Sequence, residues 1–233
     1  MIGDKLASAM QLYGNPSCID TAKCLQTAGE KGVDIEAMLI NSGDEVKADS
    51  PLSSAPLLKD QNNTVYGTYA IMSYLDDKGF GPSLVPRNGV IRAVMYQYAH
   101  IATDHVQPQA AASLKGSADE SILNTAFDLL ENLLTNPPDP KLGKGVFICG
   151  EFSLADIHWM SCVNVLEATG NGGLVSSRAK TSEWCAAVKD HDSTSKEAVK
   201  PYTFLPTKEE MDSNTLRNAV SYTHLTLPTI YSV

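Results

Sequence analysis

The chain has 233 residues, of which 43% are hydrophobic and 19% charged, so it can bury a core and is not a disordered chain. Its 27 acidic and 18 basic residues give a net charge of −9, which disfavours nucleic acid and anionic membranes as partners because their phosphates are also negative. No run of ~18 apolar residues occurs, so we predict no membrane span.

The N-terminus and the cysteines indicate in which cellular compartment the protein is expected. Residues 1–10 lack a basic start followed by an apolar stretch, so we expect no secretory signal. The five cysteines are scattered, with no CxxC motif and no Cys/His spacing typical of a metal site. An odd, unclustered set is typical of reduced thiols, and we therefore expect a cytoplasmic protein without a bound metal.

The first 80 residues alternate between strand and helix patterns. An apolar run at 10–13 is followed by apolar residues at helical spacing from Cys18 until Gly32, and 33–39 has the composition of a strand. This order predicts two parallel strands joined by a crossover helix. After a polar loop at 41–54, the pattern predicts a strand from 55, a turn at 60–63, a strand at 64–66 and a helix at 68–77.

The rest of the chain has a different character. Prolines within 81–89 interrupt any helix and indicate a linker. We expect an α/β domain over 1–80 and an all-helical domain over 90–216, because only helical periodicity follows the linker. The tail at 217–233 looks non-native and is left out of the fold prediction. The predicted helices cover 90–106, 120–134, 153–167 and 184–188.

Four motifs occur in the order and at the distances seen in one family. Residues 12–21, LYGNPSCIDT, are similar to the YGxPxS-x-x-T opening of phi-like cytosolic glutathione S-transferases. Residues 50–58, SPLSSAPLL, resemble that family's NPxGxVPxL motif, and residues 67–75, GTYAIMSYL, resemble ESxAIxxYL. Residues 150–157, GEFSLADI, resemble GxxFSLADI. Together the four motifs identify the chain as similar to the cytosolic glutathione S-transferase superfamily.

The resemblance implies a thioredoxin-like half, an all-α half and glutathione as co-substrate, with no metal. It also implies a cis bond before Pro56, which turns the backbone of Ala55 towards the peptide part of glutathione. Thr68 lies at a predicted helix N-terminus, where free amides favour an anion, and is implied to hold the γ-glutamyl carboxylate. Lys47 could meet the glycyl carboxylate. Relatives carry Glu or Gln in place of Gly67 to bind the ligand's amino group, so the glycine predicts weaker binding.

Each of these positions also has a purely structural interpretation. Pro56 is equally an ordinary trans proline at a strand edge, and Thr68 an N-cap. Lys47 is equally a solvated lysine in a loop.

The activating position itself is occupied by a thiol. Aligning residues 12–21 with the family motif places Cys18 where the activating serine would be, and a shift of one residue would place Ser17 there instead. A cysteine at a helix N-terminus can form a stabilised thiolate that exchanges with disulfides. The alternative is that Cys18 is an inert small hydrophobic residue. We expect the four other cysteines to be packing residues.

Two further positions are interpreted from local chemistry. Ser153 and Asp156 have the spacing of a capping box, so we expect Asp156 to stabilise a helix start and not to act as a catalytic acid. Tyr96 and Tyr98 lie on the helix that borders the second-substrate site in relatives, although aromatic residues on such a helix are more often in the core.

Two functions from different classes remain open at this point. One is a glutathione-dependent transferase, or thiol transferase, acting on a small electrophile or disulfide. The other is a non-catalytic subunit of the same fold that serves as a scaffold in a larger assembly. The resemblance also implies a homodimer as the usual quaternary state.

Overall fold

The computed structural model describes residues 10–15, 18–40, 46, 48–50, 55–140 and 142–191, except for the side chains of 39 and 143. Two predicted site residues, Ser17 and Lys47, lie outside these ranges, as does the tail at 217–233.

The N-terminal half is a four-stranded mixed sheet of thioredoxin type. Strand β1 (Met10–Gly14) pairs in parallel with β2 (Ile35–Leu39), and helix α1 (Ile19–Glu30) connects the two, as predicted. Strands β3 (Leu57–Asp60) and β4 (Asn63–Tyr66) form the predicted hairpin, and the sheet order is β2-β1-β3-β4. The third strand begins two residues later than expected, after Pro56, which has no backbone N–H for the ladder.

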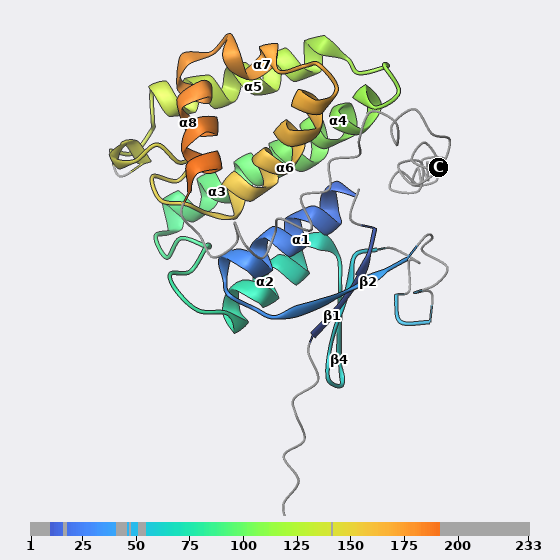
Figure 1. The fold of residues 1–233 in the computed structure, drawn as a ribbon. Coiled ribbons are helices and arrows are strands. Elements are labelled where there is room, and N and C mark those ends of the chain that lie inside the picture. Colours follow the sequence, from blue (N-terminus) through green and yellow to red (C-terminus); the bar gives the residue numbers. More distant parts are fainter. Residues whose placement is uncertain are drawn as a thin grey trace, which may run out of the picture.

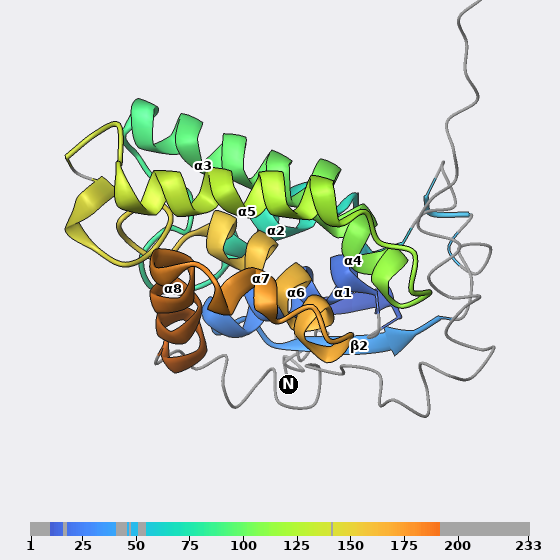
Figure 2. The same ribbon diagram turned by 90° about the horizontal axis from the view of Figure 1, so that it is seen from above.

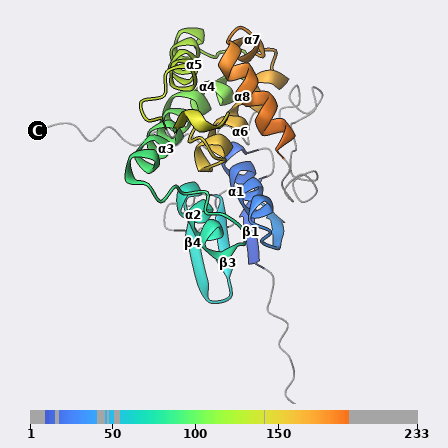
Figure 3. The ribbon, with the colours of Figure 1, turned by 90° about the vertical axis from the view of Figure 1, so that its left-hand side faces the viewer.

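Helix α2 (Thr68–Lys78) completes this half. It lies with α1 between the sheet and the helical half, so that both helices cover one face of the sheet (Figures 1 and 3). The helical half contains α3 (Gly89–Ile101), η2 (Ala102–Val106), α4 (Gln107–Ser113), α5 (Glu120–Thr135), η3 (Leu142–Lys144), α6 (Leu154–Ala168), α7 (Gly173–Ser176) and α8 (Ala179–Asp190).

The predicted helix at 90–106 differs most from the structure. It is interrupted by η2, a π-helical segment, and then continues as α4 to Ser113. Pro108 lies in the first turn of α4, where it lacks the N–H that an uninterrupted α-helix would need. A widened π turn before it relieves this conflict. The prediction also missed α7, in a glycine-rich stretch, and made α8 too short.

One hydrophobic core runs through both halves. Trp159 of α6 is fully buried at its centre, where it packs edge-on against Phe127 at 5.4 Å and donates from Nε1 to the Tyr98 carbonyl at 2.9 Å. The Tyr98 hydroxyl in turn donates to the Leu129 carbonyl at 3.0 Å, joining α3 to α5, which run side by side in Figure 2. Tyr98 is therefore a core residue.

The start of α6 is built around a buried carboxylate. The capping box of Ser153 and Asp156 is present, as predicted. Asp156 accepts hydrogen bonds from the amides of Ile148 and Ser153 at 3.0 and 2.9 Å, from the Ser153 hydroxyl at 2.9 Å and from Trp184 Nε1 at 2.8 Å. Burial raises the pKa of Asp156, against the opposing effect of these four donors. The residue ties α6 to α8 and is structural.

A buried ion pair between the ends of α1 and α2 holds Asp76, which in turn binds the linker between the halves. Lys31 Nζ lies 3.0 Å from Asp76 Oδ1, and only 3% of each side chain is exposed. Asp76 also accepts from the Leu84 amide at 2.9 Å, and the Leu84 carbonyl accepts from the amide of Leu154 at 3.1 Å. The linker therefore connects the end of α2 with the start of α6.

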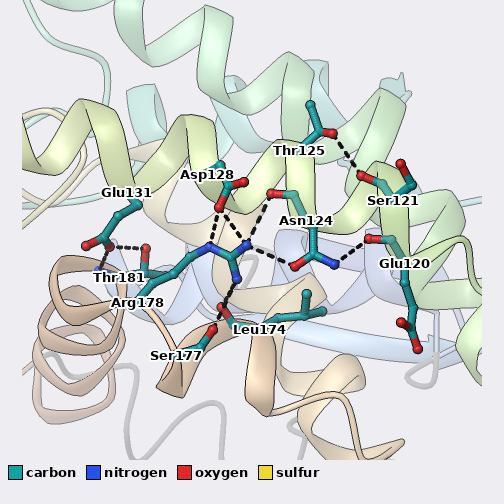
Figure 4. A network of polar contacts seen from close by, with 10 residues as sticks. All are labelled: Glu120, Ser121, Asn124, Thr125, Asp128, Glu131, Leu174, Ser177, Arg178 and Thr181. Carbon is teal, nitrogen blue, oxygen red and sulfur yellow. Dashed lines mark hydrogen bonds and ion pairs between the residues drawn. The ribbon is translucent and has the colours of Figure 1, made fainter.

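A polar network on the outer side of the helical half joins α5, α7 and α8 (Figure 4). Arg178 donates to Asp128 at 2.8 Å and to the Leu174 carbonyl at 2.7 Å. Glu131 accepts from the Thr181 amide and hydroxyl at 2.7 and 2.8 Å and thereby caps the start of α8. These contacts hold α5, α7 and α8 together.

Candidate functional site

The register of the sheet brings three predicted site segments together. Tyr13, next to last in β1, pairs with Leu57 at the start of β3, and Leu57 also pairs with Tyr66 at the end of β4. The chain that leaves β1 towards Cys18, the residues Ala55 and Pro56 before β3, and the residues Gly67 and Thr68 after β4 therefore meet at one edge of the sheet. Helix α1 is joined to this edge by the Cys24 thiol, whose sulfur lies 3.9 Å from the Thr68 carbonyl oxygen.

Cys18 is the N-cap residue of α1 and is partly exposed. Its amide donates to the Asn15 carbonyl at 2.9 Å, which closes the turn between β1 and α1. The turn is tight because Gly14 faces the buried Thr21, where a Cβ on the glycine would lie 2.4 Å from the Thr21 hydroxyl oxygen. A glycine at this position thus allows the close approach of strand and helix.

The thiol of Cys18 is not a preformed thiolate. Burial of the sulfur and the nearby Asp20 carboxylate raise the pKa of Cys18 to about 11. The amides of Thr21 and Asp20 and the Thr21 hydroxyl act in the opposite direction without outweighing them. A helix start by itself favours a lowered thiol pKa, but at Cys18 desolvation outweighs this effect. At neutral pH the sulfur is protonated.

The bond between Ala55 and Pro56 is cis, as the resemblance implied. Pro56 is buried, whereas Ala55 is only partly buried and packs against a second small core cluster with Ile40, Val46 and Leu57. The backbone before β3 is therefore presented at the same sheet edge as Cys18.

The start of α2 differs slightly from the prediction. Gly67, not Thr68, is the N-cap, because its carbonyl accepts the first helical bond from the Ile71 amide at 3.0 Å. Gly67 has a φ of +89°, in the region that favours glycine, and an added Cβ would meet no atom within 4 Å. The backbone conformation at position 67 therefore favours glycine, although there is room for a side chain. Thr68 occupies the first helical position.

A cleft of about 340 Å³ opens beside Thr68 between the two halves. Among its lining residues, Thr68 is the predicted glutathione contact, and Tyr96 is one of the two tyrosines on the helix expected to border the second-substrate site. Tyr96 is 41% exposed and lines the cleft, whereas its neighbour Tyr98 belongs to the core. The other lining residues come from α1, α2, α3, η2 and α6, and they are Asp20, Tyr69, Ala99, His100, Thr103, Asp104 and His158.

The four other cysteines, Cys24, Cys149, Cys162 and Cys185, are buried as expected, and burial raises the pKa of each. Among the described residues, no group of three or more His, Cys, Asp or Glu side chains has an arrangement that could hold a metal ion. None of the described helices combines the length and apolar composition needed to cross a membrane.

The mixed four-stranded sheet, the cis-proline at its edge and the helices that follow define a protein with the glutathione-transferase fold. A family model described as glutathione S-transferase, N-terminal domain, matches residues 12–83. Glutathione S-transferase Z2 of Arabidopsis thaliana is 29% identical over 165 residues, which cover 63% of this chain and 73% of that protein.

Solved structures show the same fold. A delta-class glutathione transferase of Nilaparvata lugens is 21% identical with a TM-score of 0.69, over 90% of this chain and 99% of that one. A maize glutathione S-transferase I in complex with an atrazine–glutathione conjugate is 20% identical with a TM-score of 0.65, over 84% of this chain and 97% of that one. Residues 12–83 thus match the glutathione S-transferase N-terminal domain, and the described residues have the glutathione-transferase fold.

Proposed function

We propose that the protein is a glutathione-dependent thiol transferase in which Cys18 is the reacting group. The observation that carries the proposal is the meeting of Cys18, the cis Ala55–Pro56 bond and the start of α2 at one edge of the sheet. This arrangement offers a thiol, the peptide backbone of Ala55 and the N-terminal amides of α2, which suit the sulfur, the peptide and a carboxylate of glutathione.

The reaction requires two exchanges. The Cys18 thiolate attacks the glutathione sulfur of a mixed disulfide, so that a Cys18–glutathione disulfide forms and the substrate leaves as a thiolate, which takes a proton from water. A second glutathione thiolate then attacks the glutathione sulfur of that disulfide. Oxidised glutathione leaves and the Cys18 thiolate is regenerated. Glutathione is therefore the reductant, and the substrate disulfide is reduced to a thiol.

The remaining predicted residues have supporting roles. Backbone groups of Ala55 pair with the peptide of glutathione, and the first amides of α2 at Thr68 hold the γ-glutamyl carboxylate. Lys47 is proposed to meet the glycyl carboxylate. Gly67 supplies no partner for the ligand's amino group, so we expect weak glutathione binding.

Retention on immobilised glutathione and turnover of a mixed disulfide of glutathione and cysteine test the proposal. We expect Cys18→Ala to abolish turnover while retention persists. Cys24→Ala is the matched control, because this thiol lies on the same helix but is buried. Failure of retention together with turnover that is unchanged in Cys18→Ala would rule the proposal out.

A second candidate is a non-catalytic subunit of the same fold. The protonated Cys18 thiol and the missing side chain at Gly67 favour it, since both weaken catalysis. This candidate predicts co-purification with a larger assembly through the helical half. Recovery only as a homodimer with glutathione activity would argue against it.

Conjugation of an electrophile activated by Ser17 is a further variant of the enzyme hypothesis. The variants Ser17→Ala and Cys18→Ala separate it from thiol transfer, because each removes one candidate group. Loss of conjugation in Ser17→Ala alone would assign the reaction to the serine.

A further inference from the structure

A buried lysine lies where α1 meets α4. The side chain of Lys23 has no exposed surface, and its Nζ donates to Oε1 of Gln107 and lies 3.5 Å from Oδ1 of Asp20. Gln107 is also buried, and its Nε2 donates to Oδ2 of Asp20 at 2.9 Å. The Gln107 amide therefore bridges the two charged groups. A charge is rarely buried without a partner, and this arrangement fixes the Asp20 carboxylate against the helical half.

The ion pair has an inner and an outer member. Lys23 is fully buried, whereas 17% of the Asp20 side chain is exposed. The two residues are three positions apart in α1, so they lie on one face of the helix, with Asp20 nearer to the N-terminus. The positive charge therefore lies in the interior of the protein, and the negative charge reaches its surface.

The carboxylate lies beside the proposed reacting thiol. Asp20 is in the first turn of α1, two positions after the N-cap residue Cys18, which is partly exposed. Burial of the sulfur is the largest cause that raises the pKa of Cys18, and the charge of Asp20 is the next. Among the described residues, Asp20 is the charged side chain that acts on this sulfur. Lys23 therefore does not cancel the field of its partner at Cys18.

A fixed carboxylate beside a thiol discriminates between disulfides by their charge. A disulfide with a positive charge close to its sulfur is attracted to Asp20 as it approaches Cys18, and one with a negative charge is repelled. Between unit charges about 7 Å apart in water, the effect is roughly threefold in each direction, or roughly tenfold between a cation and an anion. A pair that served only as a joint between α1 and α4 would cause no such preference.

We propose that Asp20, held by Lys23 and Gln107, makes Cys18 prefer disulfides that carry a positive charge next to the sulfur. The inference rests on the proposed function, in which Cys18 is the reacting group, and it names the substrate class as mixed disulfides of amine-bearing thiols. Asp20 determines specificity and takes no part in bond making. The Cys18 thiolate attacks one sulfur of the disulfide, the new S–S bond forms as the old one breaks, and the other half leaves as a thiolate that takes a proton from water.

Three disulfides that differ only in their end groups test this inference. They are cystamine, which ends in ammonium groups, hydroxyethyl disulfide, which is uncharged, and dithiodipropionate, which ends in carboxylates. Mass spectrometry of the full chain follows formation of the Cys18 adduct at low ionic strength and a single pH. Each rate is divided by the rate of mercaptoethanol with the same disulfide, which removes differences in intrinsic reactivity. The thiolate fraction of Cys18 cancels when two disulfides are compared.

On this scale we expect cystamine to react roughly tenfold faster than dithiodipropionate, with the uncharged disulfide between them. Added salt should reduce the preference, because it screens partly exposed charges. Asp20→Asn should reduce it to about two- to threefold, with the remainder due to the net negative charge of the protein. Lys23→Met should increase the preference, because it leaves the Asp20 carboxylate without its counter-charge.

Asp77→Asn is the matched control. It removes the same charge from an exposed position near the end of α2, the opposite end from Thr68, and should retain the preference of wild type. Should Asp20→Asn fail to fold because Lys23 is left unpaired, the double variant Asp20→Asn/Lys23→Met makes the same test against Lys23→Met alone.

Two negative results have different meanings. An equal preference with and without Asp20, with the Cys18 adduct formed in both proteins, would overturn the inference and leave the proposed function standing. Failure of all three disulfides to form a Cys18 adduct would overturn the proposed function and this inference together.

Discussion

The reactivity of Cys18 should depend steeply on pH. Its pKa of about 11 compares with 9.0 for an unperturbed thiol, so at neutral pH it has roughly 100-fold less thiolate. A thiolate of higher pKa is the stronger nucleophile, with a Brønsted coefficient of about 0.4–0.5, which recovers roughly 6–10-fold. We therefore expect Cys18 to react with a small disulfide about tenfold more slowly than a free thiol at neutral pH.

The rate should rise close to tenfold per pH unit through the alkaline range and level off only near the pKa of about 11. Stopped-flow reaction with dithiodipyridine, followed by mass spectrometry of each cysteine peptide, measures this rate. Cys18→Ser provides the background from the four buried thiols. A rate that levels off at or below pH ~8 would refute the reasoning, because it would mean that the helix start outweighs desolvation. In that case the thiol-transfer reaction would be fast at neutral pH.

Three further predictions concern stability and ligand affinity. Asp156→Ala should lower the free energy of unfolding by about 3–5 kcal/mol in urea titration, because four buried donors lose their acceptor, whereas the exposed Asp77→Ala should change it by less than ~0.5 kcal/mol. Burial opposes ionisation of Glu131, but the amides of Lys180 and Thr181, with the Thr181 hydroxyl and Arg178, lower its pKa overall. The stability that Glu131 contributes should therefore be complete above its unfolded pKa of ~4.3 and be lost as the pH falls through its lower folded pKa. The unfolding temperatures of wild type and Glu131→Gln should accordingly become equal at low pH. Gly67→Ala and Gly67→Glu should both lower the free energy of unfolding by about 1–3 kcal/mol, because neither side chain suits the positive φ of this position. Only Gly67→Glu should bind glutathione more tightly than wild type in calorimetry. Equal affinities in the two variants would show that position 67 does not contact the ligand.

Several features could be predicted because they depend on neighbours in the sequence. The capping box of Ser153 and Asp156 spans three residues, and the crossover helix between the first two strands follows from periodicity alone. The cis bond before Pro56 followed from the family resemblance of its motif. Local patterns of this kind determined the order of elements and the fold class.

The properties of the site were decided by contacts between distant segments. The pKa of Cys18 follows from burial, which no local pattern reports, and the helix N-terminus by itself pointed in the opposite direction. The pairing of His158 with Thr103 joins residues 55 positions apart, across a π turn that periodicity did not reveal. Sequence thus determined most of the elements and their order, because helix capping and hydrophobic periodicity act locally. Only the tertiary structure decided which side chains lose water and which face the cleft, because desolvation depends on everything packed around a group.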